Sequence, residues 1–336
     1  MQMEMDAKQK IDFVVPWVDG SDPDWLRQKR FYSKEDGDQS ASRYRDWGTL
    51  RYWFRSIENY APWVNHVYFI TCGQCPDWLN LECEKLRFIR HEDYIPDAYL
   101  PTFSSHVIEL NLHRIRGLSE QFVYFNDDVF LTSPVNQEDF FKNGCPCDRA
   151  VMNAVANTDI ENFMPYIMMN NMAVINMRFN KQKVLKENRK KWFTMKYGKD
   201  LGKNILLSPW KYFTGFCNFH ICTPFLKSTL ETVWEKEEKI LDQTCRHRFR
   251  SREDVNQYLF RYWQFADGRF CPGGITGSYL TIGQDSREKI YSTLTGGQYQ
   301  AVCINDDPFP MDFQKEKENL ISALNRILPE PSRYER

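Results

Sequence analysis

The sequence has 336 residues, of which 42% are hydrophobic and 15% aromatic, so it can bury a large core and lacks the composition of a disordered chain. Its 44 Lys and Arg nearly balance its 45 Asp and Glu, and the net charge of -1 argues against wholesale binding of nucleic acid. No apolar run approaches the roughly 18 residues of a membrane span, and the first ten residues lack the apolar segment of a secretory signal.

The ten cysteines are expected to be free thiols in a reducing cytoplasm, because no secretory signal is recognised. Cys72 and Cys75 form a C-x-x-C pair, and Cys145 and Cys147 lie close together further along the chain. A redox motif or a zinc site is the alternative interpretation. The two pairs are far apart in sequence and fit no familiar zinc-binding spacing, so we favour thiols without chemistry.

The first half of the chain alternates between predicted strands and helices. Hydrophobic periodicity and turn residues predict strands at 11–15, 66–71, 86–90 and 122–125, and helices at 49–63 and 104–115. This order predicts an α/β, Rossmann-like fold in which helices flank a mostly parallel sheet. Ligands of such sheets bind beyond the carboxyl ends of the strands, so polar residues that follow different strands are expected to converge on one crevice.

The second half is less regular. Helices are expected at 181–196, 224–241 and 253–265, followed by a Gly-rich loop and short strand at 271–283, a strand that ends in Asn-Asp-Asp at 301–307, and an amphipathic helix at 313–328. No internal repeat or linker separates the two halves. We therefore expect a single domain, 1–336, with an irregular second half.

Two adjacent carboxylates, Asp127 and Asp128, interrupt the apolar segment VYFNDDVFL. An unpaired carboxylate in such a place costs several kcal/mol. Asn126 and the two aspartates could form a simple turn, but the apolar residues on both sides disfavour an exposed one. Mg²⁺ (or Mn²⁺) takes one or two carboxylates together with substrate phosphates, and nucleotide-sugar transferases with a glycosyltransferase-A-like fold place such a motif at a strand end. We therefore predict a metal site at Asp127 and Asp128.

His106, Glu109 and His113 fall on one face of the predicted helix at 104–115. Their spacing is not the His-Glu-x-x-His pattern of a zinc site. We interpret His106 as a polar residue beside a cleft or as a buried histidine satisfied by a carboxylate. His113 is assigned a phosphate or hydroxyl contact.

Arginines are concentrated just before and within the predicted helix at 49–63. The planar guanidinium suits phosphate, although a solvated helix face is the alternative. The cluster consists of Arg43, Arg45, Arg51 and Arg55.

Three further polar residues are candidates in the second half. Arg252 and Asp254 are predicted at the start of the helix at 253–265, and helix N-termini attract phosphate. His220 lies in an aromatic and apolar context. It is either a structural histidine or a general base with a pKa near the working pH.

These motifs resemble the conserved regions of the Stealth family of sugar-1-phosphate transferases. The resemblance extends from about residue 11 to residue 307 and rests on IDFVVPWVDGSDPDW, SRYRDWGTLRYWFRSIENYAPWVNHVYFITCGQCPDWLN, LPTFSSHVIELNLHRIRGLSEQFVYFNDDVFL, HICTPFLKS with SREDVNQYL, and VCINDD. Two positions depart from the family pattern. Cys72 stands where Asp or Asn is expected before Gly-Gln, and His106 also differs, which argues against chemistry at either position.

The resemblance implies a metal-dependent reaction with a UDP-sugar donor. An acceptor hydroxyl attacks the phosphate attached to the sugar, UMP leaves and a phosphodiester forms, as in capsular polysaccharide synthesis by bacteria. The implied halves are a nucleotide-sugar half at 11–145 and an acceptor half at 146–311, with a C-terminal helix and tail at 312–336. The implied cofactor is Mg²⁺ or Mn²⁺, and the implied partners are the UDP-sugar and a glycan.

The resemblance also implies roles for individual residues. Asp127 and Asp128 hold the metal, and His220 is the general base with Arg252 and Asp254 beside it. Further candidates come from the fourth region and from the residue before the aspartate pair. The implied donor-binding residues are Trp17, Asp19, Gly20, Ser21, Asp22, Arg43, Arg51 and His113, and the additional candidates are Asn126, Asn305 and Asp306.

Two other functions stay open at this stage. An ordinary glycosyltransferase would use the same crevice but release UDP, and a thiol redox or zinc-binding protein would use Cys72 and Cys75. We expect the protein to work in the cytoplasm, with docking at the inner face of the membrane as an open alternative.

Overall fold

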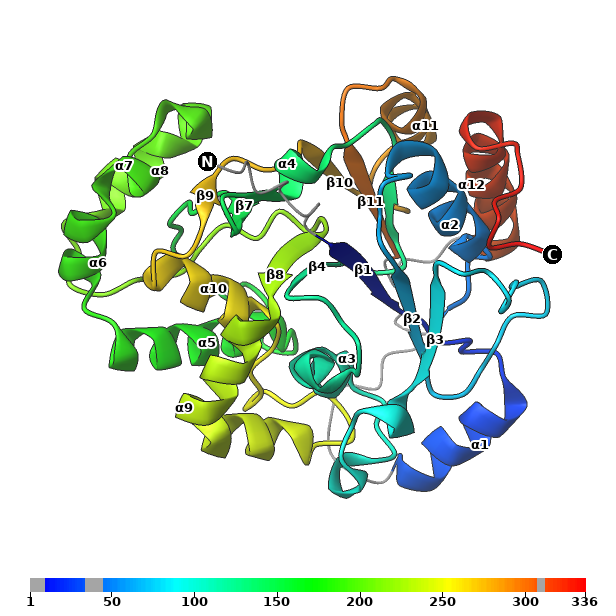
Figure 1. Ribbon diagram of the computed structural model, residues 1–336, viewed down its shortest axis with the longest axis horizontal. Coiled ribbons are helices and arrows are strands. Elements are labelled where there is room, and N and C mark those ends of the chain that lie inside the picture. Colours follow the sequence, from blue (N-terminus) through cyan, green and yellow to red (C-terminus); the bar gives the residue numbers. More distant parts are fainter. Residues whose placement is uncertain (1–9, 34–44, 307–311) are drawn as a thin grey trace, which may run out of the picture.

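The computed structural model describes residues 10–33, 45–306 and 312–336. Strands form a central sheet, and helices pack around it (Figure 1). The strands are β1 Ile11–Pro16, β2 Val67–Thr71, β3 Leu86–Arg90, β4 Gln121–Tyr124, β5 Val129–Leu131, β6 Phe141–Lys142, β7 Cys145–Asp148, β8 Thr223–Leu226, β9 Cys271–Pro272, β10 Gly277–Thr281 and β11 Ala301–Asn305.

The helices lie on both faces of the sheet and at its edges (Figure 1). They are α1 Pro23–Tyr32, α2 Leu50–Tyr60, α3 Ser105–Leu110, α4 Gln137–Phe140, α5 Met164–Arg178, α6 Lys181–Glu187, α7 Arg189–Trp192, α8 Leu201–Leu207, α9 Lys227–Cys245, α10 Tyr258–Ala266, α11 Arg287–Thr295 and α12 Phe313–Ile327. Among the residues that the structure describes, no helix is both long and apolar enough to cross a membrane.

Five strands form the central sheet in the order β3-β2-β1-β4-β8. β1 runs parallel to both β2 and β4, and β2 runs parallel to β3, whereas β8 is antiparallel to β4. This confirms the predicted α/β class with a mostly parallel sheet. In a second sheet, β11 pairs in parallel with β10 and antiparallel with β5. β8 and β11 thus come from the second half of the chain but pair with strands of the first half.

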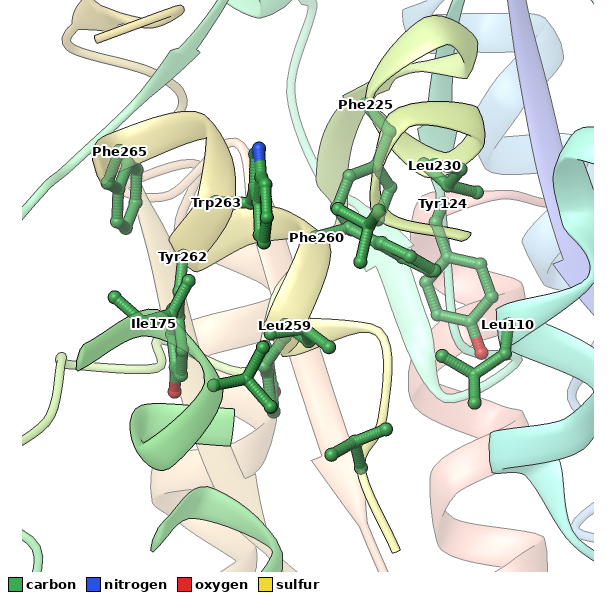
Figure 2. Packing of buried hydrophobic residues seen from close by; sticks show 14 of the residues in the cluster. Leu110, Tyr124, Ile175, Phe225, Leu230, Leu259, Phe260, Tyr262, Trp263 and Phe265 are labelled. Atoms are coloured by element: carbon green, nitrogen blue, oxygen red, sulfur yellow. The ribbon is translucent and has the colours of Figure 1, made fainter. Parts of the chain in front are cut away.

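Side chains of β1 alternate between two apolar cores, one on each face of the sheet. Phe13 and Val15 belong to the core beneath α2, whereas Val14 belongs to the core that contains α10. In this second core, Phe260 of α10 packs near Phe225 of β8 (Figure 2). Because both faces are covered, β1 and β2 are fully apolar at their centres, as expected for parallel strands.

Several predicted boundaries were wrong. The helix predicted at 224–241 begins at Lys227, because Thr223–Leu226 pairs with β4, and sheet hydrogen bonds override local helix preference. The helix predicted at 253–265 begins at Tyr258. The segment at 181–196 is broken at Asn188, a residue type that favours helix ends, into α6 and α7. Helices α1, α4, α5, α8 and α11 were not predicted.

Candidate active site

The carboxyl ends of β2, β1 and β4 lie side by side, and each is followed by polar residues. Pro16 at the end of β1 is in register with Ile70 of β2, and Val14 is in register with Tyr124 at the end of β4. The turn at 17–22 therefore lies next to Gln74 on one side and next to the loop at 126–128 on the other. The structure brings these motifs together, as the strand-end argument predicted.

A cleft of about 680 Å³ opens beside the first of these turns; we call it the N-terminal cleft. Its lining contains four of the predicted donor-binding residues and further polar groups. These lining residues include Trp17, Asp19, Asp22, Asp46, Arg51, Gln74 and Trp78.

Gln74 holds the turn that borders the N-terminal cleft. Its side-chain carbonyl accepts from the Asp19 backbone N–H at 2.8 Å, and its amide donates to the Asp19 carbonyl at 2.9 Å and to Asp22 Oδ2 at 3.0 Å. The hydrogen bond from Gln74 lowers the pKa of Asp22, which also caps α1 by accepting from the backbone N–H of Asp24. Asp22 is therefore ionised at neutral pH and lines the N-terminal cleft, and its carboxylate already accepts hydrogen bonds from Gln74 and Asp24.

Gly20 and Ser21 lie in the turn at 17–22, and Arg51 lies in the wall of the N-terminal cleft. Ser21 donates from its backbone N–H and its hydroxyl to Asp19 Oδ1, at 2.8 Å and 2.6 Å, and Gly20 lies inside this turn. The Arg51 guanidinium lies 5.1 Å from the ring centroid of Trp78 in the wall of the cleft. Arg43 lies outside the described residues.

Asp127 and Asp128 are partly buried at the end of β4. Burial and the neighbouring charge of Asp128 raise the pKa of Asp127 to about 7, and Asp46 in the wall of the N-terminal cleft adds to the same shift. Burial raises the pKa of Asp128 to about 6, although the Cys303 thiol donates to Oδ2 at 3.4 Å. Oδ1 of Asp128 is buried without a hydrogen-bond partner among the described residues. Two repelling carboxylates thus share one site beside the cleft.

This arrangement fits a divalent cation. A cation between the two carboxylates would offset their repulsion and occupy the open oxygen of Asp128. No group of three or more His, Cys, Asp or Glu is arranged for metal binding in the described part of the chain. A site built on this pair would therefore leave several coordination positions to phosphate oxygens and water, as is usual for Mg²⁺.

The fourth-region residues lie beside the aspartate pair. The Ile304 backbone N–H donates to the Asp128 carbonyl at 2.9 Å, which places the end of β11 against the loop after β4. Asn305 donates from its side-chain amide to the Asp306 carbonyl, and Asp306 forms an ion pair with Arg45 at 3.0 Å. Asn126 lies in the same loop as the aspartates, and its carbonyl accepts from Val129.

His220 lies in a strained turn on the other side of β11. Its φ of 50° is in the left-handed region, which non-glycine residues rarely adopt and which is found at functional sites more often than elsewhere. Nδ1 lies 3.2 Å from the Tyr258 hydroxyl. Burial, and then the charge of Arg250, lowers the pKa of His220, so the imidazole is neutral at pH 7.

A short chain of contacts joins His220 to the aspartate pair. The His220 and Tyr279 rings meet edge to face with centroids 5.0 Å apart. Tyr279 of β10 is in register with Cys303 of β11, and the thiol of Cys303 contacts Asp128. The neutral histidine and the two carboxylates therefore lie on opposite sides of one strand pair.

His220 also lines a small pocket of about 60 Å³, which we call the His220 pocket. Arg261 and Asp148 form a buried ion pair in its wall, with Nε to Oδ2 at 2.6 Å, and Arg149 lies beside them. Gly277 closes the opposite side, where an added Cβ would collide with Cγ2 of Ile221, the residue after His220. The missing side chain at Gly277 is thus what lets the histidine turn pack against β10.

The structure corrects the prediction for His113. The predicted helix at 104–115 ends at Leu110, and a 3₁₀ turn follows at Leu112–Arg114. His113 packs against Trp234 with centroids 5.7 Å apart, and burial lowers its pKa to about 3. The charges of Arg114 and Lys227 also lower it, and the Lys227 backbone N–H donates to the Glu120 carbonyl at 2.8 Å, just before β4 begins. His113 therefore lies toward the amino end of β4, whereas the N-terminal cleft lies at the carboxyl ends of the strands, so its proposed contact with the donor gains no support.

Asp254 is also placed differently from the prediction. Its side chain is fully buried and accepts from Nδ1 of His106 at 2.9 Å, from Nδ1 of His247 at 2.7 Å and from the Ser251 backbone at 2.9 Å. Burial opposes its ionisation, but the hydrogen bonds from the two histidines prevail and lower its pKa. Both oxygens are occupied by these hydrogen bonds, so the structure favours a role for Asp254 in positioning its neighbours. The interpretation of His106 as a buried histidine satisfied by a carboxylate is confirmed.

Arg252 does not lie at a helix N-terminus, because α10 begins six residues later. Its guanidinium stacks 5.1 Å from Phe163 and 5.2 Å from Tyr166 and reaches Glu161 at 3.3 Å. A contact between Arg252 and phosphate stays a prediction. The cation whose charge acts on His220 is Arg250, which donates to the Ser105 hydroxyl at 2.7 Å.

Sequence reasoning missed several residues of the site. Gln74 follows a parallel strand, so the strand-end argument could have found it. Asp46, Tyr258, Arg250 and Cys303 carry no local signal, because only the folded chain places them beside the motif residues.

The cysteine pair Cys72 and Cys75 lies at the same end of the sheet, and Cys75 lines the N-terminal cleft. All ten cysteines are free thiols, and these two are exposed. Desolvation raises the pKa of both thiols, which lowers the thiolate fraction at neutral pH. Neither thiol therefore has the lowered pKa that activates a redox cysteine.

Comparisons with known proteins match this chain over nearly its whole length. The Stealth protein conserved region 1 matches residues 9–37, and conserved region 2 matches residues 43–147. The capsular polysaccharide phosphotransferase WcwK of Streptococcus pneumoniae is 42% identical over 99% of this chain and 100% of its own. The receptor polysaccharide phosphotransferase WefC of Streptococcus gordonii is 40% identical over 97% of this chain and 99% of its own.

A solved structure of the galactosyltransferase LgtC, in complex with donor and acceptor sugar analogs, is also similar to this chain. It covers 96% of this chain and 98% of its own, at 10% identity and a TM-score of 0.38. A TM-score this low supports no further argument.

Proposed function

Since the chain belongs to the Stealth family, we propose that it transfers a sugar-1-phosphate from a UDP-sugar to a hydroxyl of a glycan in the synthesis of a surface polysaccharide. Relatives at about 40% identity are named polysaccharide phosphotransferases, which supports the transfer of a phosphoryl group. The observation that carries the proposal is that two repelling carboxylates, Asp127 and Asp128, lie on one side of β10 and β11 and the neutral His220 lies on the other.

The donor would occupy the N-terminal cleft. Trp17 and Trp78 offer aromatic faces to the base, and the guanidinium of Arg51 offers paired donors to phosphate oxygens. Asp127 and Asp128 would hold Mg²⁺ or Mn²⁺ at the edge of this cleft. The cation, when bound, supplies positive charge to the diphosphate as the bond to the leaving nucleotide breaks.

The acceptor would approach from the His220 pocket. A neutral His220 whose Nδ1–H donates to the Tyr258 oxygen keeps a lone pair on Nε2 for the acceptor proton. The acceptor oxygen then bonds to the sugar-linked phosphorus, the bond from that phosphorus to the UMP oxygen breaks, and UMP leaves with the electron pair. Burial, together with the charge of Arg250, lowers the pKa of His220 and keeps it unprotonated before the reaction.

Identification of the released nucleotide tests this proposal. The protein is incubated with a panel of UDP-sugars, MgCl₂ and a mixture of glycan acceptors, and the nucleotides are separated by chromatography. The proposal predicts UMP with one donor, loss of UMP in EDTA, and recovery with excess Mg²⁺. UDP as the product would instead show a glycosyltransferase. Asp128→Asn should lower UMP release by about 10² to 10³, whereas Asp242→Asn, on α9, serves as the matched control.

A further inference from the structure

Residues 181–212 differ in charge from the rest of the chain. This segment contains ten Lys and Arg and only two acidic residues, a net charge of +8 in a chain whose total is -1. It forms α6, α7, the 3₁₀ segment at Met195–Asp200, α8 and the turn that follows, and the helices lie together at the outer edge of the molecule, at the left of Figure 1. The exposed basic residues are Lys183, Lys186, Arg189, Lys190, Lys196, Lys199, Lys203 and Lys211.

The same segment exposes large apolar side chains. Met195 is 83% exposed and Leu206 is 72% exposed, and three neighbours in the chain are exposed by more than half. These five residues, Met195, Ile205, Leu206, Trp210 and Tyr212, together with the exposed basic residues, form what we call the basic–apolar face. Exposure of such side chains in water is unfavourable, and several of them gathered in one segment point to an interaction site.

The basic–apolar face is held on a fixed support. The ammonium of Lys181 is buried and donates to the carbonyls of Leu207 at 2.6 Å, Trp210 at 3.0 Å and Tyr212 at 3.2 Å. These bonds fasten the turn after α8 to the first turn of α6. The apolar side chains are therefore presented by a rigid scaffold rather than by a loose loop.

The face is also joined to the His220 pocket. Arg149 in the wall of that pocket donates to Asp200 Oδ2 at 2.8 Å and to the Tyr197 carbonyl at 3.3 Å. Tyr212 precedes His220 by only eight residues. A surface bound to the face would thus lie near the His220 pocket.

We propose that the basic–apolar face docks on an anionic phospholipid bilayer, with the apolar side chains among the acyl chains and the lysines at the headgroups. Charge complementarity favours an anionic partner, and the aliphatic side chains favour a lipid over a soluble polyanion, which has no apolar interior to receive them. The face lies on the bilayer without crossing it. This inference concerns the location of the protein and does not depend on the donor or on the bond that breaks.

Vesicle flotation tests the inference. The intact protein is mixed with phosphatidylcholine vesicles, or with vesicles in which about one third of the lipid is phosphatidylglycerol, and binding is measured in the floated fraction. We expect binding to the anionic vesicles, at least about tenfold weaker binding to the neutral ones, and release at high salt. Failure of the protein to float with anionic vesicles would overturn the inference.

A variant locates the contact. Leu206→Asn with Trp210→Ala should weaken vesicle binding by about tenfold or more, whereas Phe31→Asn, at a residue 75% exposed on α1, should not change it. Binding of UDP and the melting temperature are measured on the same samples, so loss of donor binding is distinguished from loss of docking. Equal flotation of the double variant and the wild type would contradict the proposal, as would binding to soluble dextran sulfate without binding to vesicles.

Discussion

Replacement of Asp127 by Asn should stabilise the metal-free protein at pH 8. Burial and Asp128 raise the pKa of Asp127 to about 7, so the folded state resists the loss of a proton that the unfolded state gives up near 3.8. Above pH 7 the Asp127 carboxylate destabilises the folded state by the full amount. This destabilisation fades as the pH falls from 7 toward 4, because the folded state then keeps the proton on Asp127.

The size of the destabilisation follows from the raised pKa of Asp127. A pKa raised by about three units corresponds to roughly 4 kcal/mol of unfolding free energy. The side chain is partly exposed, so water screens part of this energy. We therefore expect about 2 kcal/mol, or roughly 3 °C in melting temperature for a chain of this length. The Asn variant should melt above the wild type by about this amount at pH 8 in EDTA, and the difference should vanish near pH 4.

Calorimetry in EDTA and in MgCl₂ measures both consequences. Mg²⁺ should raise the melting temperature of the wild type at pH 8 and leave that of Asp127→Asn nearly unchanged. Asp242→Asn is the control of opposite sign, because hydrogen bonds from Arg246 and Tyr99 lower the pKa of that carboxyl, and its loss should destabilise the protein at pH 8. An Asp127→Asn variant that melts below the wild type at pH 8 in EDTA would refute the reasoning.

Two further substitutions test the neighbours of the site. Gly277→Ala should lower turnover about 10²-fold, because the new Cβ would lie 3.1 Å from Ile221 Cδ1 and collide with Cγ2, so that Ile221 must move by roughly 1 Å. Gly202→Ala, where nothing lies within 4 Å of the new Cβ, should keep full activity. Equal activity of the two variants would exclude this packing role. Cys72→Ser with Cys75→Ser should keep UMP release within about threefold, since both thiols have a raised pKa, and complete loss of activity with an intact fold would favour thiol chemistry.

The central sheet could be predicted from the sequence because its strands carry local signals. The segments at 11–15 and 66–71 are short apolar runs that end in turn residues, and the alternation with helices implied parallel pairing. β8 carried no such signal. Thr223–Leu226 is a strand only because it pairs with β4, and that partner lies about a hundred residues away in sequence.

The site residues that directly follow strands could be predicted from the sequence, whereas those whose surroundings depend on burial in the folded chain could not. The turn at 17–22 and the loop at 126–128 converge because parallel strands end at one edge of a sheet. The position of His113 on the predicted helix was wrong because the helix ends at Leu110, where Asn111 donates its side-chain amide to the Val107 carbonyl. The burial of Asp254 could not be predicted, because it depends on a hydrogen bond from His106, which lies 148 residues away in the sequence.

The fate of the sugar-linked phosphorus tests the central claim most directly. A UDP-sugar labelled with ³²P at that phosphorus is incubated with the protein, Mg²⁺ and acceptor, and glycan and nucleotide are then separated. The account predicts that the label enters the glycan and that unlabelled UMP is released, and His220→Ala should suppress transfer while donor binding persists. Labelled UDP together with an unlabelled glycan would contradict it.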